Sequence, residues 1–246
     1  MSSVPEMLSV VIPAYNEEAR IAPTVRHVLG YLEARFPRHE VIVVDDGSAD
    51  ATAAVAAEAA AGRANFRVLR RETNMGKGAA VRRGVLEARG DAILFMDADL
   101  SMPIEEVEKL LAALGDGADL AIASRRLAGA ELRKRPSRPR EALGHAFTFL
   151  VRAFTGVGVS DSQCGFKLFR REAARDLFTR QTIDGFAFDV ELLMLARGRW
   201  RVREVPITCT HAPGSRVSLT RDAPRMLLDV ARLALRRTRA PAAPPR

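Results

Sequence analysis

The chain contains few cysteines and few aromatic residues, and it has no long hydrophobic run. Among its 246 residues are two cysteines, Cys164 and Cys209, and aromatic side chains make up 6%. Two cysteines without paired spacing favour free thiols, with a single disulfide as the alternative. No window approaches the roughly 18 consecutive apolar residues of a membrane span. The N-terminus also lacks the basic and apolar segments of a signal peptide, so we expect a cytoplasmic protein.

Acidic residues are in the minority. The 38 lysines and arginines outnumber the 30 aspartates and glutamates, which leaves a formal net charge of +8. Such a chain suits an anionic partner, namely a nucleotide phosphate, a nucleic acid or an acidic membrane surface. A nucleic acid is disfavoured, because no aromatic residues are interleaved with the basic ones as a stacking platform.

The first half of the chain alternates short apolar runs with helical patterns. Buried strands are predicted over residues 8–13, 40–45, 66–69, 93–96 and 120–123, with a helix between each pair. This alternation indicates right-handed crossovers and an α/β fold, with a Rossmann-like, mostly parallel central sheet flanked by helices.

The alternation ends after residue 126. A mobile basic loop is predicted over 127–140, then an apolar helix over 141–155, a helix over 188–197, a strand over 201–208 and a last helix over 224–237. The loop is either simply solvated or contacts an anionic lipid phosphate. The last helix packs on the core, pairs subunits or lies on a membrane. Residues 240–246 are predicted to form a disordered, proline-rich tail.

Four polar clusters follow four of the predicted strands: Tyr15-Asn16-Glu17, Asp45-Asp46-Gly47-Ser48, Asn74-Met75-Gly76-Lys77 and Asp97-Ala98-Asp99. Because the carboxyl ends of parallel strands meet at one edge of a sheet, we expect the clusters to converge there. Asp97 and Asp99 next to a diphosphate suit Mg²⁺ or Mn²⁺, which prefer oxygen ligands. The alternative for this pair is a solvated, Asp-rich turn.

The turn at Gly76-Lys77-Gly78 is a weaker signal. It is not a dinucleotide-binding fingerprint, because it follows the third strand and Val81 stands where the last glycine or alanine belongs. It is not a P-loop either, since no Lys-Ser or Lys-Thr pair follows. A glycine-rich helix start still offers N–H groups to a phosphate.

These motifs resemble those of inverting family 2 glycosyltransferases of the GT-A fold. The run Asp161-Ser162-Gln163-Cys164-Gly165-Phe166-Lys167, together with Phe188-Asp189-Val190-Glu191, is similar to dolichyl-phosphate β-glucosyltransferases and more loosely to polyprenyl-phosphate relatives. The resemblance covers about residues 8–216. It implies a single GT-A domain over residues 1–239, with a nucleotide-binding half (1–126) and an acceptor-binding half (127–239).

The resemblance also implies a role for individual residues. Donor-binding residues are Pro13, Tyr15, Glu17, Asp45, Asp46, Gly76, Lys77, Asp97, Ala98, Asp99 and Arg216, with Asp97 and Asp99 also holding the metal. Catalytic residues are Asp161, Arg125 and Asp189, and acceptor-binding residues are Arg138 and Lys167. Two departures are that Cys209 stands where the glucosyltransferases carry tryptophan, and that the N-terminal membrane anchor of the eukaryotic enzymes is missing.

Two further predictions concern the surroundings of individual side chains. Asp189 and Glu191 lie two apart on a helix and cannot both face one site. We expect Asp189 to point inward and Glu191 to be solvated or ion-paired. Cys164 is expected to be a small packed residue rather than a nucleophile, because no histidine lies near it in sequence.

The sequence thus predicts an inverting, Mg²⁺- or Mn²⁺-dependent transferase that moves a hexose, glucose from UDP-glucose, onto a polyprenyl or dolichyl phosphate. It would act in the cytoplasm, peripherally at the inner face of the membrane. The alternatives are a GDP-mannose-dependent synthase and a transferase with a soluble acceptor. A sugar-1-phosphate nucleotidylyltransferase is disfavoured, because the segment after the first strand lacks the glycine-rich, arginine-containing signature.

Overall fold

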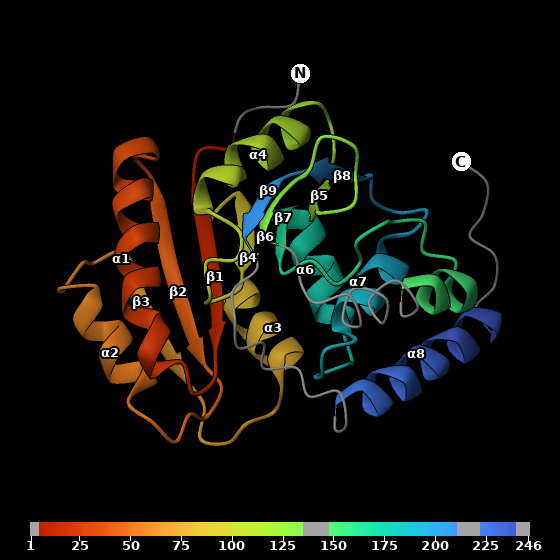
Figure 1. Cartoon of the computed structure of the whole chain (residues 1–246), viewed down its shortest axis with the longest axis horizontal. Helices are drawn as coiled ribbons and strands as arrows, with labels where there is room; N and C mark the ends of the chain where they lie inside the picture. The colour runs from red at the N-terminus through yellow and green to blue at the C-terminus, as the bar shows by residue number, and fades with distance from the viewer. Residues whose placement is uncertain (1–4, 135–147, 211–221, 240–246) are drawn as a thin grey trace.

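The central feature of the computed structural model, which describes residues 5–134, 148–210 and 222–239, is a seven-stranded sheet (Figure 1). Its strand order is β3-β2-β1-β4-β7-β5-β8. The strands are β1 (Leu8–Ala14), β2 (His39–Asp45), β3 (Phe66–Arg70), β4 (Ala92–Met96), β5 (Leu120–Ser124), β7 (Phe166–Arg170) and β8 (Val202–Pro206). All run parallel except β7, which is antiparallel to its neighbours β4 and β5. The predicted mostly parallel α/β sheet is confirmed.

The strands in the middle of the sheet are apolar on both faces because helices cover them. Val41 to Val44 of β2 and Ile93 to Phe95 of β4 are fully buried. Such continuous β-branched and apolar runs are typical of parallel strands. β1 pairs with β2 in register from Leu8 opposite His39 to Ala14 opposite Asp45, so the two strands end side by side.

The helices are α1 (Glu18–Arg35), α2 (Thr52–Ala59), α3 (Lys77–Glu87), α4 (Val107–Gly115) after the 3₁₀ turn η1 (Ile104–Glu106), α6 (Arg171–Arg180), α7 (Phe188–Ala196) and α8 (Asp222–Arg239). Residues 148–155 are also helical. In Figure 1, α1 lies beside α2, and α3 packs against α6. α8 lies at the periphery, where Val230 and Leu233 join the hydrophobic core. None of the helices in the described part of the chain is both long and apolar enough to cross a bilayer.

The reversed direction of β7 brings a second set of residues to the carboxyl edge of the sheet. β1, β2, β3, β4, β5 and β8 all end at this edge, whereas β7 begins there. Residues 161–165, which precede β7, therefore lie next to residues that follow β4 and β5. The N–H of Asp97 donates to the carbonyl of Gly165 at 3.1 Å, which joins the two loops directly.

Two elements differ from the sequence prediction. Part of the predicted loop 127–140 forms a short strand, β6 (Glu131–Lys134), which pairs in parallel with β9 (Thr208–Thr210). A charged four-residue segment has no apolar pattern of its own, and its pairing with a strand some 75 residues later stabilises it. α6 was not predicted either. Residues 135–140 of the basic loop and the tail 240–246 lie outside the described residues.

Candidate active site

The loops after β1 and β2 are joined by hydrogen bonds at the edge of the sheet. The N–H of Asn16 donates to Ser48 Oγ at 2.9 Å, and the N–H of Glu17 donates to Thr52 Oγ1 at 2.8 Å. Asn16 has a positive φ of 52°, a conformation that asparagine tolerates better than most residues. In this loop Tyr15 is exposed at the edge of the sheet, whereas Glu17 is buried and accepts a hydrogen bond from Arg20.

Asp45 and Asp46 are buried at the end of β2 and have different partners. Asp46 accepts hydrogen bonds from the N–H groups of Met75 (3.2 Å) and Gly76 (2.7 Å), so it connects the β2 loop to the start of α3. Burial raises the pKa of Asp46 against the effect of these bonds. Asp45 Oδ1 accepts the N–H of Ser48 at 3.0 Å, but its Oδ2 accepts no hydrogen bond from the described residues. That buried oxygen is instead paired with Arg70, whose Nε lies 3.5 Å away.

The carboxylates of Asp97 and Asp99 lie on the loop that follows β4. Asp97 Oδ1 is 2.6 Å from Lys77 Nζ, and a Cβ at Gly165 would overlap Asp97 Oδ2, so only glycine fits beneath this carboxylate. Asp99 Oδ1 accepts the N–H of Ser101 at 2.9 Å. Among the described residues no group of three aspartate, glutamate, histidine or cysteine side chains is placed to hold a metal. Two carboxylates are the number that Mg²⁺ commonly takes from a protein when phosphates and water complete its shell.

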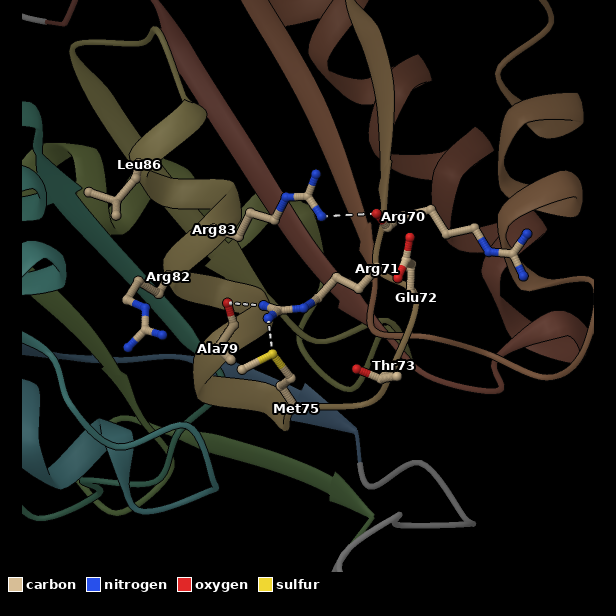
Figure 2. A pocket seen from close by; sticks show the side chains of 9 residues that line it. All are labelled: Arg70, Arg71, Glu72, Thr73, Met75, Ala79, Arg82, Arg83 and Leu86. Carbon is tan, nitrogen blue, oxygen red and sulfur yellow. Dashed lines mark hydrogen bonds between the residues drawn. The ribbon is translucent and has the colours of Figure 1, made fainter.

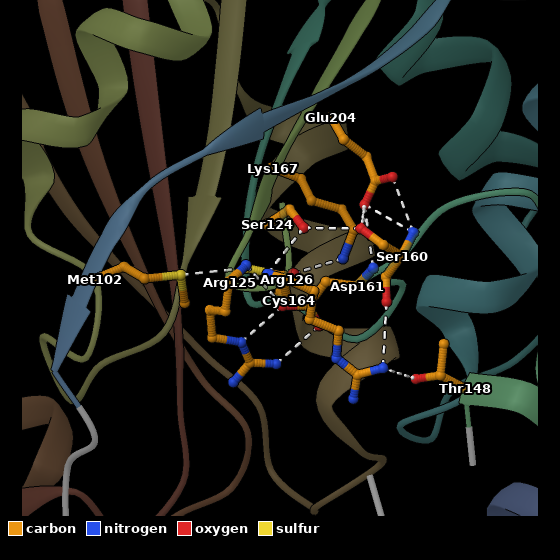
Figure 3. A network of polar contacts seen from close by, with 10 residues as sticks. All are labelled: Met102, Ser124, Arg125, Arg126, Thr148, Ser160, Asp161, Cys164, Lys167 and Glu204. Atoms are coloured by element: carbon orange, nitrogen blue, oxygen red, sulfur yellow. Dashed lines mark hydrogen bonds and ion pairs between the residues drawn. The ribbon is translucent and has the colours of Figure 1, made fainter. Parts of the chain in front are cut away.

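Arg125 and Asp161 form a two-pronged ion pair at the same edge (Figure 3). Arg125 Nε donates to Asp161 Oδ2 at 2.7 Å and Arg125 Nη2 donates to Oδ1 at 2.9 Å. Asp161 is 2% exposed, and burial alone would raise its pKa, but the bonds from Arg125 outweigh burial and lower it. The pair is therefore charged near neutral pH, and the half-exposed guanidinium of Arg125 borders solvent.

A further acid supports the loop that carries Asp161. Glu204 of β8 accepts the N–H of Ser160 at 2.8 Å and the N–H of Asp161 at 3.1 Å, as Figure 3 shows. The sequence analysis missed Glu204, because an acid inside a strand pattern has no motif to mark it. It also gave no role to Ser162 or Gln163, whose Oγ and Nε2 atoms are buried with no hydrogen-bond partner in the described chain.

The structure places Lys167 and Asp189 in the interior as a buried ion pair. Lys167 is fully buried, and its Nζ lies 2.5 Å from Asp189 Oδ1 and 2.6 Å from the carbonyl of Cys164. A phosphate acceptor does not reach an ammonium that is enclosed in this way. Asp189, 2% exposed, likewise has Lys167 as its ion-pair partner.

The two acids of α7 diverge as predicted, but Glu191 is not solvated. It is 3% exposed, and its carboxylate accepts the N–H groups of Thr182 (3.0 Å) and Ile183 (2.8 Å). Cys164 and Cys209 are free and buried, which confirms the expected thiols. Burial raises the pKa of Cys164 to about 12, in keeping with a packed residue rather than a nucleophile.

A basic cavity lies beside these clusters on the outer side of α3 (Figure 2). Its volume is about 470 Å³, and its lining includes four arginines, Arg70, Arg71, Arg82 and Arg83. Arg71 Nε is 3.5 Å from Asp46 Oδ1, so the cavity borders the β2 loop without containing Asp97 or Asp99.

Most of the predicted site residues thus converge on one edge of the sheet. Those that lie at or after the ends of β1, β2, β3, β4 and β5, or that precede β7, are Pro13, Tyr15, Glu17, Asp45, Asp46, Gly76, Lys77, Asp97, Ala98, Asp99, Arg125 and Asp161. Arg138 and Arg216 lie outside the described residues.

Solved structures share this architecture. The glucosyl-3-phosphoglycerate synthase of Mycobacterium tuberculosis, solved with Mn²⁺, uridine diphosphate and glucosyl-3-phosphoglycerate, matches with a TM-score of 0.70 at 25% identity. The match covers 96% of this chain and 81% of that one. The fold and the clusters along its edge define the class of the protein, a GT-A glycosyltransferase.

Sequence comparisons place the chain within that class. The model of glycosyl transferase family 2 matches residues 9–178, and the protein belongs to this family. The dolichyl-phosphate β-glucosyltransferase of Drosophila melanogaster is 41% identical over 227 residues, which are 86% of this chain and 69% of the relative. The Homo sapiens enzyme of the same name is 40% identical over 226 residues, with 86% and 70% covered. That of Trichomonas vaginalis is 38% identical over 237 residues, with 92% and 70% covered.

Proposed function

We propose that the protein transfers glucose from UDP-glucose to the phosphate of a polyprenyl or dolichyl lipid, with inversion at the sugar carbon. The observation that carries the proposal is the identity of about two fifths to dolichyl-phosphate β-glucosyltransferases over most of the chain. The convergence of Asp45, Asp46, Asp97 and Asp99 on one sheet edge supports it, since a nucleotide diphosphate would span these groups.

The nucleoside would bind between the loops that follow β1 and β2. Tyr15 is exposed there and offers a ring surface. Asp45 Oδ2 accepts no hydrogen bond from the described residues, and its ion-pair partner is Arg70 at 3.5 Å. A donor N–H or hydroxyl from the ligand would satisfy that oxygen. The hydrogen bonds that the N–H groups of Met75 and Gly76 donate to Asp46 fix the start of α3 relative to these loops.

Asp97 and Asp99 would hold a divalent metal together with the donor diphosphate. Their oxygen chemistry and their number suit Mg²⁺ or Mn²⁺, and the Mycobacterium tuberculosis synthase was solved with either ion and uridine diphosphate. When bound, such a metal stabilises the negative charge that builds on the leaving diphosphate.

The chain's own residues would orient the acceptor and balance charge. A lipid phosphate oxygen forms a bond to the sugar C1 while the bond from C1 to the UDP oxygen breaks, and UDP leaves with the electron pair. No proton is transferred, because a phosphate monoester is ionised near neutral pH. Arg125, held by Asp161, presents a guanidinium where phosphate charge accumulates. Asp161, which is buried, would act through Arg125 by fixing the position of its guanidinium.

A membrane surface would bring the lipid acceptor to the enzyme. α8 buries Val230 and Leu233 against the core, yet it also exposes Leu228 (59%) and Leu235 (65%) on another side. These two leucines lie seven residues apart, hence two turns apart on one helical stripe. An apolar stripe on a helix that also carries exposed arginines suits the interface of an anionic membrane.

A soluble phosphorylated acceptor is the second candidate. It is favoured by the Mycobacterium tuberculosis synthase, whose structure was also solved with UDP-glucose and phosphoglyceric acid. A soluble acceptor would not require the apolar stripe of α8 to bind a membrane.

A single assay separates these possibilities. The protein is incubated with Mn²⁺, a radiolabelled UDP-sugar or GDP-mannose, and either a polyprenyl phosphate in detergent or 3-phosphoglycerate. We expect label from UDP-glucose in the organic phase. Label from GDP-mannose alone would overturn the glucose donor, and label confined to a water-soluble product would overturn the lipid acceptor.

A further inference from the structure

The ammonium of Lys77 contacts the carboxylate of Asp97, where a bound metal ion would also lie. Its Nζ lies 2.6 Å from Asp97 Oδ1, and four-fifths of its side chain is removed from solvent. A charge-assisted contact of this length is among the strong hydrogen bonds of proteins. The ammonium therefore uses a carboxylate oxygen that a divalent metal would also need.

The backbone on both sides of Lys77 is held by close contacts with the loop at residues 183–184. Gly76 has a φ of +109°, and a Cβ there would lie 2.5 Å from the carbonyl oxygen of Asp184. A Cβ at Gly78 would lie 2.6 Å from the carbonyl oxygen of Ile183. The N–H of Ala79 donates to the Asp184 carbonyl at 3.1 Å. The two glycines let the first turn of α3 press against this loop, with Lys77 between them.

The ammonium of Lys77 lies among three carboxylates, those of Asp97, Asp189 and Asp99. Asp189 is itself compensated by Lys167 at 2.5 Å. Asp97 therefore receives most of its direct compensation from Lys77 when no donor is bound.

We propose that Lys77 is the resident counter-cation of Asp97 and makes metal binding depend on the donor. This inference rests on the proposed function, because it takes Asp97 as a metal ligand. Without donor, a divalent cation has to displace the ammonium or bind beside a like charge. A nucleoside diphosphate offers Lys77 a second anionic partner, which frees the Asp97 oxygen. Metal affinity and UDP affinity are then positively coupled, each raising the other by the same factor.

Titration of Mn²⁺ into the full chain, with free Mn²⁺ followed by electron paramagnetic resonance, tests this inference. For the unaltered protein we expect weak binding alone and tighter binding with UDP. Lys77→Met should bind Mn²⁺ without UDP more tightly, by on the order of 10-fold, because the competing hydrogen bond to a charged group is gone. UDP should add less to the affinity of this variant. Lys77→Gln is the second neutral variant, should Lys77→Met fail to fold by circular dichroism.

Two variants serve as controls. Lys77→Arg keeps the positive charge and should keep the weak binding without UDP. Lys109→Met removes a half-exposed lysine that pairs with Glu106 at 2.7 Å on α4, and should match the unaltered protein.

The outcomes are distinguishable. Equal Mn²⁺ affinity of Lys77→Met and the unaltered protein without UDP, with UDP-dependent binding intact, would overturn the inference and leave the proposed function standing. Tight binding by Lys77→Arg would also overturn it, since charge would not be the cause. Failure of every variant to bind Mn²⁺ even with UDP would instead overturn the metal in the proposed function.

Discussion

At the scale of single residues, the site is built from oppositely charged side chains that meet in pairs, each with at least one partner mostly buried. Asp161 lies against Arg125, Asp189 against Lys167 and Asp97 against Lys77. Removing one partner of a buried pair leaves an uncompensated charge, whereas removing both restores neutrality. The carboxylates at the ends of strands were predictable from their motifs, but the lysine or arginine that faces each one was not.

The buried ion pair of Lys167 and Asp189 leads to a stability prediction. Lys167→Met should lower the free energy of unfolding by about 3 kcal/mol, because it leaves Asp189 buried without a counter-charge. Lys167→Met combined with Asp189→Leu should recover much of that loss. Urea unfolding followed by circular dichroism measures both. An unchanged unfolding midpoint together with a raised KM for polyprenyl phosphate would restore the acceptor role.

Burial of Cys164 leads to a pH prediction. The pKa of this thiol is about 12, and that of Cys209 is also raised by burial, so neither forms a thiolate readily in the folded state. The native protein should resist iodoacetamide at pH 8, whereas the urea-unfolded chain should take up label at both thiols. Because the folded pKa of Cys164 lies above the unfolded value of about 8.5, its contribution to stability is complete below that pH and declines as the pH rises toward 12. Rapid alkylation of the folded protein would contradict this.

At the scale of elements, the direction of β7 and the second apolar side of α8 decide what the site contains. β7 runs against its neighbours and so delivers Asp161 to the edge that holds Asp97. α8 has more apolar surface than its packing on the core uses, since Leu228 and Leu235 stay exposed. Alternation and burial do not encode the direction of a strand, so the reversal of β7 could not be predicted from the sequence.

The exposed stripe of α8 is testable apart from catalysis. Leu228→Glu with Leu235→Glu should weaken sedimentation with phosphatidylglycerol vesicles by at least about 10-fold. Each leucine contributes about 1.5–3 kcal/mol when buried in the bilayer interface, and each new carboxylate is repelled by anionic lipid. Leu86→Glu, at another exposed leucine on α3, is the matched control and should sediment as the unaltered protein does. Equal sedimentation of all three proteins would rule out α8 as the contact.

At the scale of the whole molecule, several loops that are distant in sequence form one binding edge. Asp46 accepts from Gly76, Asp97 donates to Gly165, and Asn16 donates to Ser48, so the loops are connected before any ligand is present. A ligand that binds only the folded protein stabilises it as a whole.

Binding at this edge should therefore appear in thermal unfolding. UDP with Mn²⁺ at about 100 times the dissociation constant should add about 2.7 kcal/mol and raise Tm by roughly 5–10 °C for a chain of this size. The Asp97→Ala, Asp99→Ala double variant should melt as a folded protein but show little of this shift. Differential scanning fluorimetry measures both. An equal shift in the double variant would place the metal elsewhere.

Local sequence patterns were sufficient for the class of fold and for the polar clusters. An apolar run followed by Asp97 and Asp99, or by Asp45 and Asp46, predicts a buried strand and a polar turn, because burial and turn chemistry act over a few neighbouring residues. Contacts between segments far apart along the chain required the tertiary structure. The pairing of β6 with β9, the reversal of β7 and the inward position of Lys167 depend on which segments meet when the chain closes on itself. Hydrogen bonds and ion pairs between distant segments produce no periodic pattern in the sequence. For this reason the ion pair of Lys77 with Asp97 could be identified only from the folded structure.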